Sequence, residues 1–123
     1  MKAVSWQFHN RSPVFLQIAD RVRAEILEGK YPPDSQIPSV RQLAFEAAVN
    51  PNTMQRALTQ LEEEGLLSSR GTLGRFVTSD RGVLETARKS MHEEAMRTLL
   101  HEALALGITK SDLIDFIQKE ETI

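Results

Sequence analysis

Residues 48–50 form a three-residue connection between two stretches that both carry helix signals, and this connection constrains the fold more than any other feature. Before it, Ser39 and Gln42 have the spacing of a capping box that opens a short helix. After it, Asn50 can cap a second helix through its side-chain oxygen, with Pro51 in the first helical position, where no backbone donor is needed. Two helices joined by so tight a turn predict a helix-turn-helix, here without the glycine that such turns often contain.

The apolar residues of both stretches recur at helical spacing and are expected to face one core. In the first stretch they are Val40, Leu43 and Ala44, with Phe45 and Ala47 expected close by; in the second they are Met54, Ala57, Leu58 and Leu61.

The second helix, expected from Pro51 to about Glu64 and closed by Gly65, begins with a polar outward edge. That edge consists of Asn52, Thr53, Gln55 and Arg56. Asn, Gln and Arg side chains read base edges or hold phosphates in DNA complexes. The edge therefore indicates nucleic-acid recognition, and the alternative is an ordinary capped surface helix.

A β-hairpin is expected directly after this helix. Residues 66–70 and 75–78 are strand candidates, and residues 71–74, which contain two glycines, form the turn. A hairpin in this position is the wing of a winged helix. Arg70 and Arg75 flank its tip, where a wing places arginines near phosphates or the minor groove. Taken singly, these arginines would be solvated surface residues.

The N-terminal part should pack against this unit. Residues 1–12 look extended, as on a strand or a packed arm, because Val4, Trp6 and Phe8 alternate with polar residues. A helix from Pro13 to about Glu28 follows, with Ser12 as its expected cap and Gly29 as its end. Its apolar stripe consists of Phe15, Ile18, Val22 and Ile26.

The C-terminal part is expected to be two helices. Asp80 can cap a long helix from about Arg81 to Leu106, and Thr109 with Asp112 suggests a capping box for a short last helix. Two such helices cannot bury their apolar faces alone, so they pack on the first domain or, as we prefer, on a second copy. The residues predicted to dimerise are Leu84, Met91, Ala95, Leu99, Ala103, Leu106, Leu113, Phe116 and Ile117.

Together these elements predict a mainly α-helical protein with a small β-hairpin. A winged helix-turn-helix DNA-binding domain is expected over residues 1–79, and a helical dimerisation domain over residues 80–123.

Composition removes several other classes. The chain of 123 residues has no cysteine, and no apolar run approaches the roughly 20 residues of a membrane span. Its net charge of −2 is concentrated late, since residues 1–81 carry +1 and residues 82–123 carry −3, and DNA binding needs only a local positive face. No Gly-rich phosphate loop is present, and His9, His92 and His101 lack metal-ligand spacing. We therefore expect a cytoplasmic protein that is not an enzyme, with no metal, no cofactor and no membrane partner.

Several strings, in this order along the chain, resemble the winged-helix domain of the GntR family of bacterial transcription regulators. They are residues 13–18, 37–44, 49–53, 61–66 and 74–77. The Asn-Pro-Asn-Thr string at residues 50–53 and the short two-helix tail resemble the YtrA subfamily. The tail is far too short for the effector domains of the larger subfamilies.

The resemblance implies a homodimer that binds an inverted-repeat operator in double-stranded DNA and usually represses, with a link to ABC-transporter genes. It implies that Arg41 grips a phosphate, that residues 50–56 enter the major groove and that the wing tip, residues 70–74, approaches the minor groove. The residues expected to contact DNA are Ser39, Arg41, Asn50, Asn52, Thr53, Gln55, Arg56, Arg70, Gly71, Thr72 and Arg75.

This chain departs from the family pattern at three positions, two in the expected recognition helix and one in the wing tip. Pro51 and Gln55 stand where many members carry arginine, which shifts the expected base contacts toward Arg56. Thr72 stands where the wing usually has glycine, so a differently bent tip is expected.

Two other functions are compatible with the sequence. Winged helices also serve as protein–protein adaptors, which would show no salt-dependent DNA affinity. A ligand-sensing regulator would hold a small molecule between the tail helices, at Met91, Leu99 or Phe116, although core packing is the more ordinary use of such residues. No particular effector is indicated.

Overall fold

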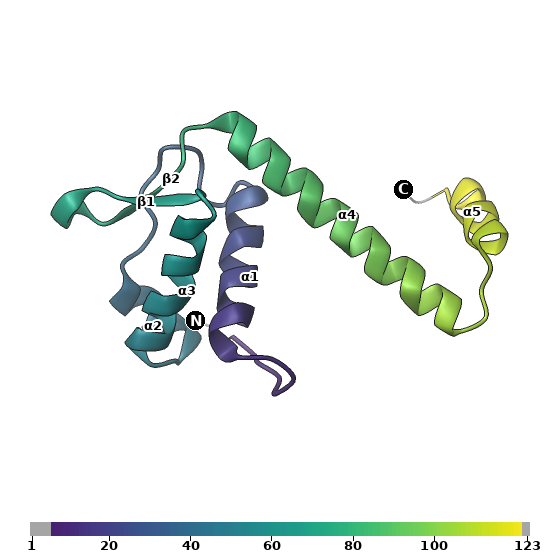
Figure 1. The fold of residues 1–123 in the computed structure, drawn as a ribbon, viewed down its shortest axis with the longest axis horizontal. Helices are drawn as coiled ribbons and strands as arrows, with labels where there is room; N and C mark the ends of the chain where they lie inside the picture. The colour runs from purple at the N-terminus through teal and green to yellow at the C-terminus, as the bar shows by residue number, and fades with distance from the viewer. Residues whose placement is uncertain (1–5, 122–123) are drawn as a thin grey trace. The chain divides into compact units, whose positions relative to one another are not determined.

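The computed structural model describes residues 6–121 and divides into two compact units, Met1–Glu85 and Thr86–Ile123 (Figure 1). It is mainly helical with one two-stranded antiparallel hairpin, as predicted. The helix α4 (Arg81–Ala105) belongs to both units, so the predicted domain boundary at residues 79 and 80 stays a prediction.

The first unit is built around α3 (Pro51–Glu63), which packs against α1 (Val14–Leu27) and α2 (Val40–Ala47) (Figure 1). Met54, Leu58 and Leu61 on α3 are fully buried. Burying each such side chain contributes about 1.5–3 kcal/mol, so the inward face of α3 determines which residues point outward. The core also contains Ile18, Ala19, Val22, Ile26, Leu27, Ile37, Leu43, Ala44, Ala47, Ala57, Leu66, Leu67, Val77 and Leu84.

Both caps predicted for the helix-turn-helix are present. The Ser39 hydroxyl accepts a hydrogen bond from the Gln42 backbone at 3.1 Å, and Asn50 Oδ1 accepts one from the Asn52 backbone at 2.7 Å. The cap predicted for α1 is wrong, since Pro13 occupies that position and no side chain caps the helix. Gln17 instead donates to the Ser12 carbonyl, because its longer side chain reaches back over the first turn.

The turn between α2 and α3 contains a strained residue. Ala48 has φ 57° and ψ 46°, a left-handed conformation that costs an L-amino acid about 1–2 kcal/mol. It is exposed, so its methyl group is not needed for packing.

We expect Ala48→Gly to stabilise the protein by about 0.5–1 kcal/mol, because glycine relieves the strain but loses more backbone entropy on folding. Urea unfolding measures this. The matched control is Ala24→Gly inside α1, which should destabilise by about 1 kcal/mol. Destabilisation by Ala48→Gly would show that the turn is not strained.

The wing is shorter at its strands than predicted and more closely tied to the unit. Strand β1 (Leu67–Ser69) pairs with β2 (Arg75–Val77), with Leu67 opposite Val77. Residues 34–37 hydrogen-bond along the other side of β2, since the Ile37 backbone donates to the Arg75 carbonyl at 3.0 Å. The predicted turn is a single turn of 3₁₀ helix, η1 (Gly71–Leu73), whose Leu73 carbonyl accepts a hydrogen bond from the Gln36 side chain.

One other prediction fails in the first unit. Phe45 is 85% exposed, because it lies about 100° around α2 from Ala44 and about 200° from Leu43, which face the core. Of the two forms predicted for the N-terminal residues, residues 6–12 contain no strand, while Trp6 is half-buried under the Arg21 guanidinium, 4.1 Å from the ring centroid, as in a packed arm. Val4 lies outside the described residues.

The second unit consists of the rest of α4 and of α5 (Lys110–Lys119). Gly107, with φ 83°, follows the end of α4 and prevents the helix from continuing. The predicted capping box of Thr109 and Asp112 at the start of α5 is complete. The backbone hydrogen bond from Thr109 lowers the pKa of Asp112, which keeps it charged at the helix start. Most large apolar side chains of the second unit are exposed in the single chain. They are Met96, Leu99, Leu104, Leu106, Ile108, Ile114, Phe116 and Ile117.

Candidate nucleic-acid interface

The start of α3 presents the polar edge predicted from sequence. Asn52, Gln55 and Arg56 are exposed, while Thr53 is half-buried. The cap uses Asn50 Oδ1, so the Nδ2 donor is the main part of the Asn50 side chain left for other contacts. The fully buried Met54 and Ala57 between them hold this edge outward.

Arg56 is held by a residue of α1 that sequence reasoning assigned to the core. Its guanidinium carbon lies 3.8 Å from the centroid of the Phe15 ring, a direct cation–π contact. Phe15 is only half-buried, unlike Ile18 further along the same stripe. A hollow of about 430 Å³ opens beside this contact, lined by Pro13, Val14, Phe15, Asn52, Thr53 and Arg56.

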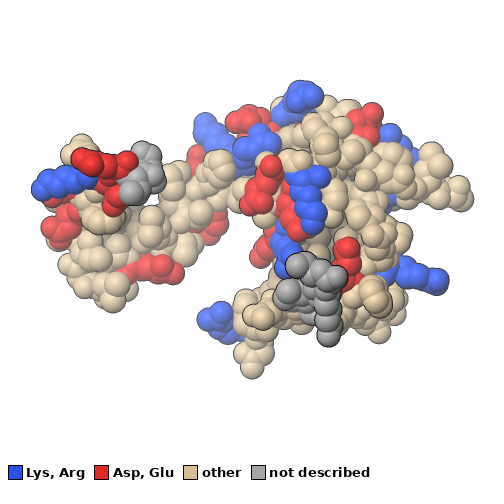
Figure 2. Space-filling view, turned by 180° about the vertical axis from the view of Figure 1, so that it is seen from behind, with Lys and Arg blue, Asp and Glu red and all other residues tan. Residues whose placement is uncertain are grey.

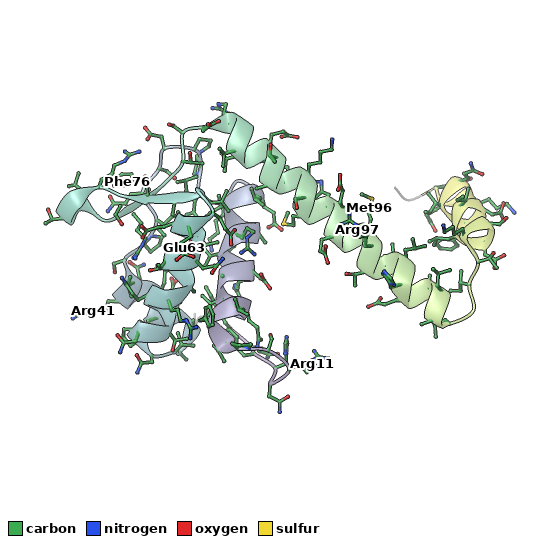
Figure 3. All side chains as sticks on the ribbon, in the orientation of Figure 1. Arg11, Arg41, Glu63, Phe76, Met96 and Arg97 are labelled. Carbon is green, nitrogen blue, oxygen red and sulfur yellow. The ribbon has the colours of Figure 1, made fainter. Side chains whose placement is uncertain are left out.

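Arg41 projects outward from the first turn of α2 (Figure 3) and makes no ion pair with any residue of the described part, 6–121. Ser39, one position before the helix, is exposed, but its hydroxyl already accepts the capping hydrogen bond. Arg41 is therefore an exposed cation at the start of α2 with no ion-pair partner among residues 6–121, which suits a phosphate contact.

The two wing arginines differ from one another. Arg75 is only 13% exposed and its Nε donates to Glu62 on α3, which also accepts from the Ser69 hydroxyl at 3.2 Å. Arg70 is 41% exposed, forms an ion pair with Asp34 and lies over the Phe76 ring at 4.1 Å. Gly71 and Thr72 at the tip are exposed. Arg75 therefore flanks the tip as predicted, but its guanidinium is mostly buried and paired with Glu62.

The acidic C-terminal end of α3 pairs with α1. Arg23 on α1 forms two hydrogen bonds with Glu64, Nε to Oε1 at 2.8 Å and Nη2 to Oε2 at 2.6 Å, and a third with Asp20. The Glu64 contact raises the pKa of Arg23, and the Arg23 contact lowers the pKa of Glu64 below its usual 4.5. Figure 2 shows basic and acidic side chains next to one another on one face of the first unit. Pairing neutralises acids that would otherwise repel DNA.

This ion pair predicts a pH dependence. Because the pKa of Glu64 is lowered in the folded state, its stabilisation is present above about pH 4.5 and is lost as the pH falls through the lower folded pKa. At pH 7, Glu64→Gln should lower the free energy of unfolding by about 1 kcal/mol, and the difference from wild type should shrink as the pH falls below 4.5. Urea unfolding across this range measures it, with exposed Glu63→Gln as control. A pH-independent difference would contradict the ion pair.

Neither a metal-binding cluster nor a membrane-spanning helix is found in the described part. Residues 6–121 contain no group of three or more His, Asp or Glu side chains placed to hold a metal ion. In the same residues, no helix has the length and apolarity needed to cross a bilayer.

A helix-turn-helix with an exposed polar edge, followed by a two-stranded wing, defines the class of winged helix-turn-helix DNA-binding proteins. Residues 15–77 match the model of the bacterial regulatory proteins of the gntR family. The chain therefore belongs to the GntR family and is a DNA-binding transcriptional regulator rather than an enzyme.

Similar proteins extend over nearly the whole chain. The chain is 29% identical to the uncharacterized HTH-type transcriptional regulator YhcF of Bacillus subtilis, over 91% of this chain and 93% of that protein. It is 28% identical to the HTH-type transcriptional repressor YtrA of the same organism, over 88% and 84%. The predicted resemblance to the GntR family and its YtrA-type members is confirmed.

Two solved structures are informative. A GntR family transcriptional regulator from Listeria monocytogenes has a TM-score of 0.82 and 31% identity, covering 93% of this chain and all of that one. AraR(DBD) in complex with operator ORX1 has a TM-score of 0.55 and 28% identity, covering 58% of this chain and 93% of that one.

Proposed function

We propose that the protein is a homodimeric repressor that recognises an inverted-repeat operator. The start of α3 enters the major groove of each half-site, and its free polar edge is the observation that supports this most directly. The similar AraR(DBD) is an operator complex, and the similar YtrA is a repressor by name. Half-site centres lie about one helical turn apart, near 10 bp, or a modest multiple of it.

Separate residues take the backbone and base contacts. Arg41 binds a phosphate and sets the position of α2, with Ser39 holding the helix start. The base contacts come from the outward edge of α3, from Asn52, Thr53, Gln55 and Arg56, while Asn50 acts mainly as cap. In the wing, the exposed Arg70, Gly71 and Thr72 approach the minor groove, and Arg75 supports the wing through Glu62.

Dimerisation uses residues 80–123, and DNA binding uses residues 1–79. Leu99, Leu106, Phe116 and Ile117 of the second unit are exposed in the single chain, which favours burial against a second copy. The same face continues over Met91, Ala95 and Leu113. Leu84 and Ala103 are already buried within one chain, with only 5% and 7% of their surface exposed. The targets include ABC-transporter genes, on the strength of the resemblance to YtrA alone.

Sequencing of random duplexes selected by the purified full-length chain tests the function. We expect a palindromic consensus whose affinity falls steeply with salt. Absence of enrichment, together with no duplex binding at low salt, would favour the protein–protein adaptor and contradict the proposal.

A ligand-sensing regulator is a second candidate, favoured by a groove of about 470 Å³ between α4 and α5. Its walls are mainly apolar and include Leu99, Ala103, Leu113 and Phe116, with Asp112 at the edge. Met91, expected there from sequence, does not line it. A small apolar molecule bound there would raise the melting temperature of the dimer, and a thermal-shift screen without any such rise would count against this function.

A further inference from the structure

Arg56 differs from the other arginines that lie over aromatic rings. Among residues 6–121, Arg21 lies over Trp6 and Arg70 over Phe76, and each also pairs with a carboxylate. Arg56 lies closest to its ring, at 3.8 Å from the Phe15 centroid, and has no carboxylate partner in the described part. The ring contact restricts the guanidinium plane but uses none of its five N–H donors.

Phe15 differs in turn from the rest of its apolar stripe. Ile18 and Val22 are 0% and 1% exposed, whereas Phe15 stays half-buried and lines the hollow beside Asn52 and Thr53. Its ring is therefore placed at the polar edge of α3 and not within the core. Leucine could fill the buried part of this position, but only an aromatic ring offers a face to a guanidinium.

We propose that Phe15 is a positioning residue, which presents Arg56 as a preset planar fork to one guanine in each half-site; this rests on the proposed operator binding. Guanine offers two acceptors, O6 and N7, at its major-groove edge, and a guanidinium matches them with two parallel hydrogen bonds. Arg56 lines the same hollow as Asn52 and Thr53. All three lie near the N-terminal end of α3, the part of a recognition helix that contacts base edges.

The expected effect follows from the entropy of the arginine side chain. An arginine that is free in solution loses rotamer freedom when it binds, while one already held against a ring loses less. Removing the ring should therefore weaken operator binding about three- to tenfold per chain, with little change on random duplex.

A double-mutant cycle in the full-length chain tests whether Phe15 acts through Arg56. Operator and scrambled-duplex dissociation constants are measured for wild type, Phe15→Leu, Arg56→Ala and the double variant, with melting temperatures for each. Phe15→Leu should weaken operator binding only where Arg56 is present, and Phe15→Tyr, which keeps the ring, should bind as wild type does. Phe15→Met serves as a second ring-free variant if leucine disturbs folding.

Replacement of each operator guanine by 7-deazaguanine, which lacks the N7 acceptor, tests the base assignment. One guanine per half-site should weaken wild-type binding when replaced and leave Arg56→Ala binding unchanged. An equal effect of Phe15→Leu with and without Arg56, an equal effect on both duplexes, or no Arg56-dependent guanine would overturn the proposal. Failure of wild type to bind any duplex would instead overturn operator binding itself.

Discussion

Leu99→Glu should leave the first unit folded, turn the proposed dimer into a monomer and weaken operator binding by about 100-fold or more. Leu99 lies on α4, is 54% exposed in the single chain and stands in the apolar face assigned to the partner copy. A carboxylate buried there without a partner would cost several kcal/mol. Loss of the dimer removes the gain from binding two half-sites at once, which commonly amounts to 10²–10⁴ in affinity.

Analytical ultracentrifugation and operator titration measure both effects. Ile117→Glu on α5, at a position 49% exposed, should behave in the same way. The matched control is Thr98→Glu, which introduces the same charge at an exposed polar neighbour of Leu99. A Leu99→Glu variant that remains dimeric, or a wild-type chain that is monomeric at micromolar concentration, would show that the tail does not pair chains.

Arg41→Ala should have the second-largest effect, and it should appear as a change in salt dependence. One phosphate contact contributes about 0.9 to the slope of log affinity against log salt, so a dimer that loses two contacts loses about 1.8. Between 50 and 200 mM salt, wild-type affinity should therefore fall about tenfold more than that of the variant.

The loss should be similar on operator and on random duplex, because phosphates carry no base information. Titrations at four salt concentrations on both duplexes measure it, and Gln42→Ala at the next exposed position is the control. A loss confined to one base pair of the operator would mean that Arg41 reads a base.

Most of the first unit could be predicted because its signals are local in the chain. The caps at Ser39 and Asn50 involve residues two or three positions away, and Gly29 and Gly65 end helices through their own backbone conformations. The predicted strands, helices and three-residue turn are all present, with ends that differ by one or two residues.

The errors concern surfaces that depend on packing between distant segments. Phe45 was placed near the core because it is apolar, but its helical phase exposes it. Arg75 flanks the wing tip as expected, but the sequence did not predict that its guanidinium pairs with Glu62, 13 residues earlier in the chain. The spacing of Arg75 and Glu62 in the sequence does not predict that they form an ion pair.

By itself, the sequence determined the order of elements, the helix-turn-helix and the polar edge of α3, because capping and apolar periodicity act over one or two helical turns. Only the tertiary structure decided which charges remain available. Packing of α1 against α3 places Arg23 on Glu64 and Phe15 under Arg56, and these contacts join residues 41 positions apart in each case. They depend on how two buried faces meet, which no local pattern specifies.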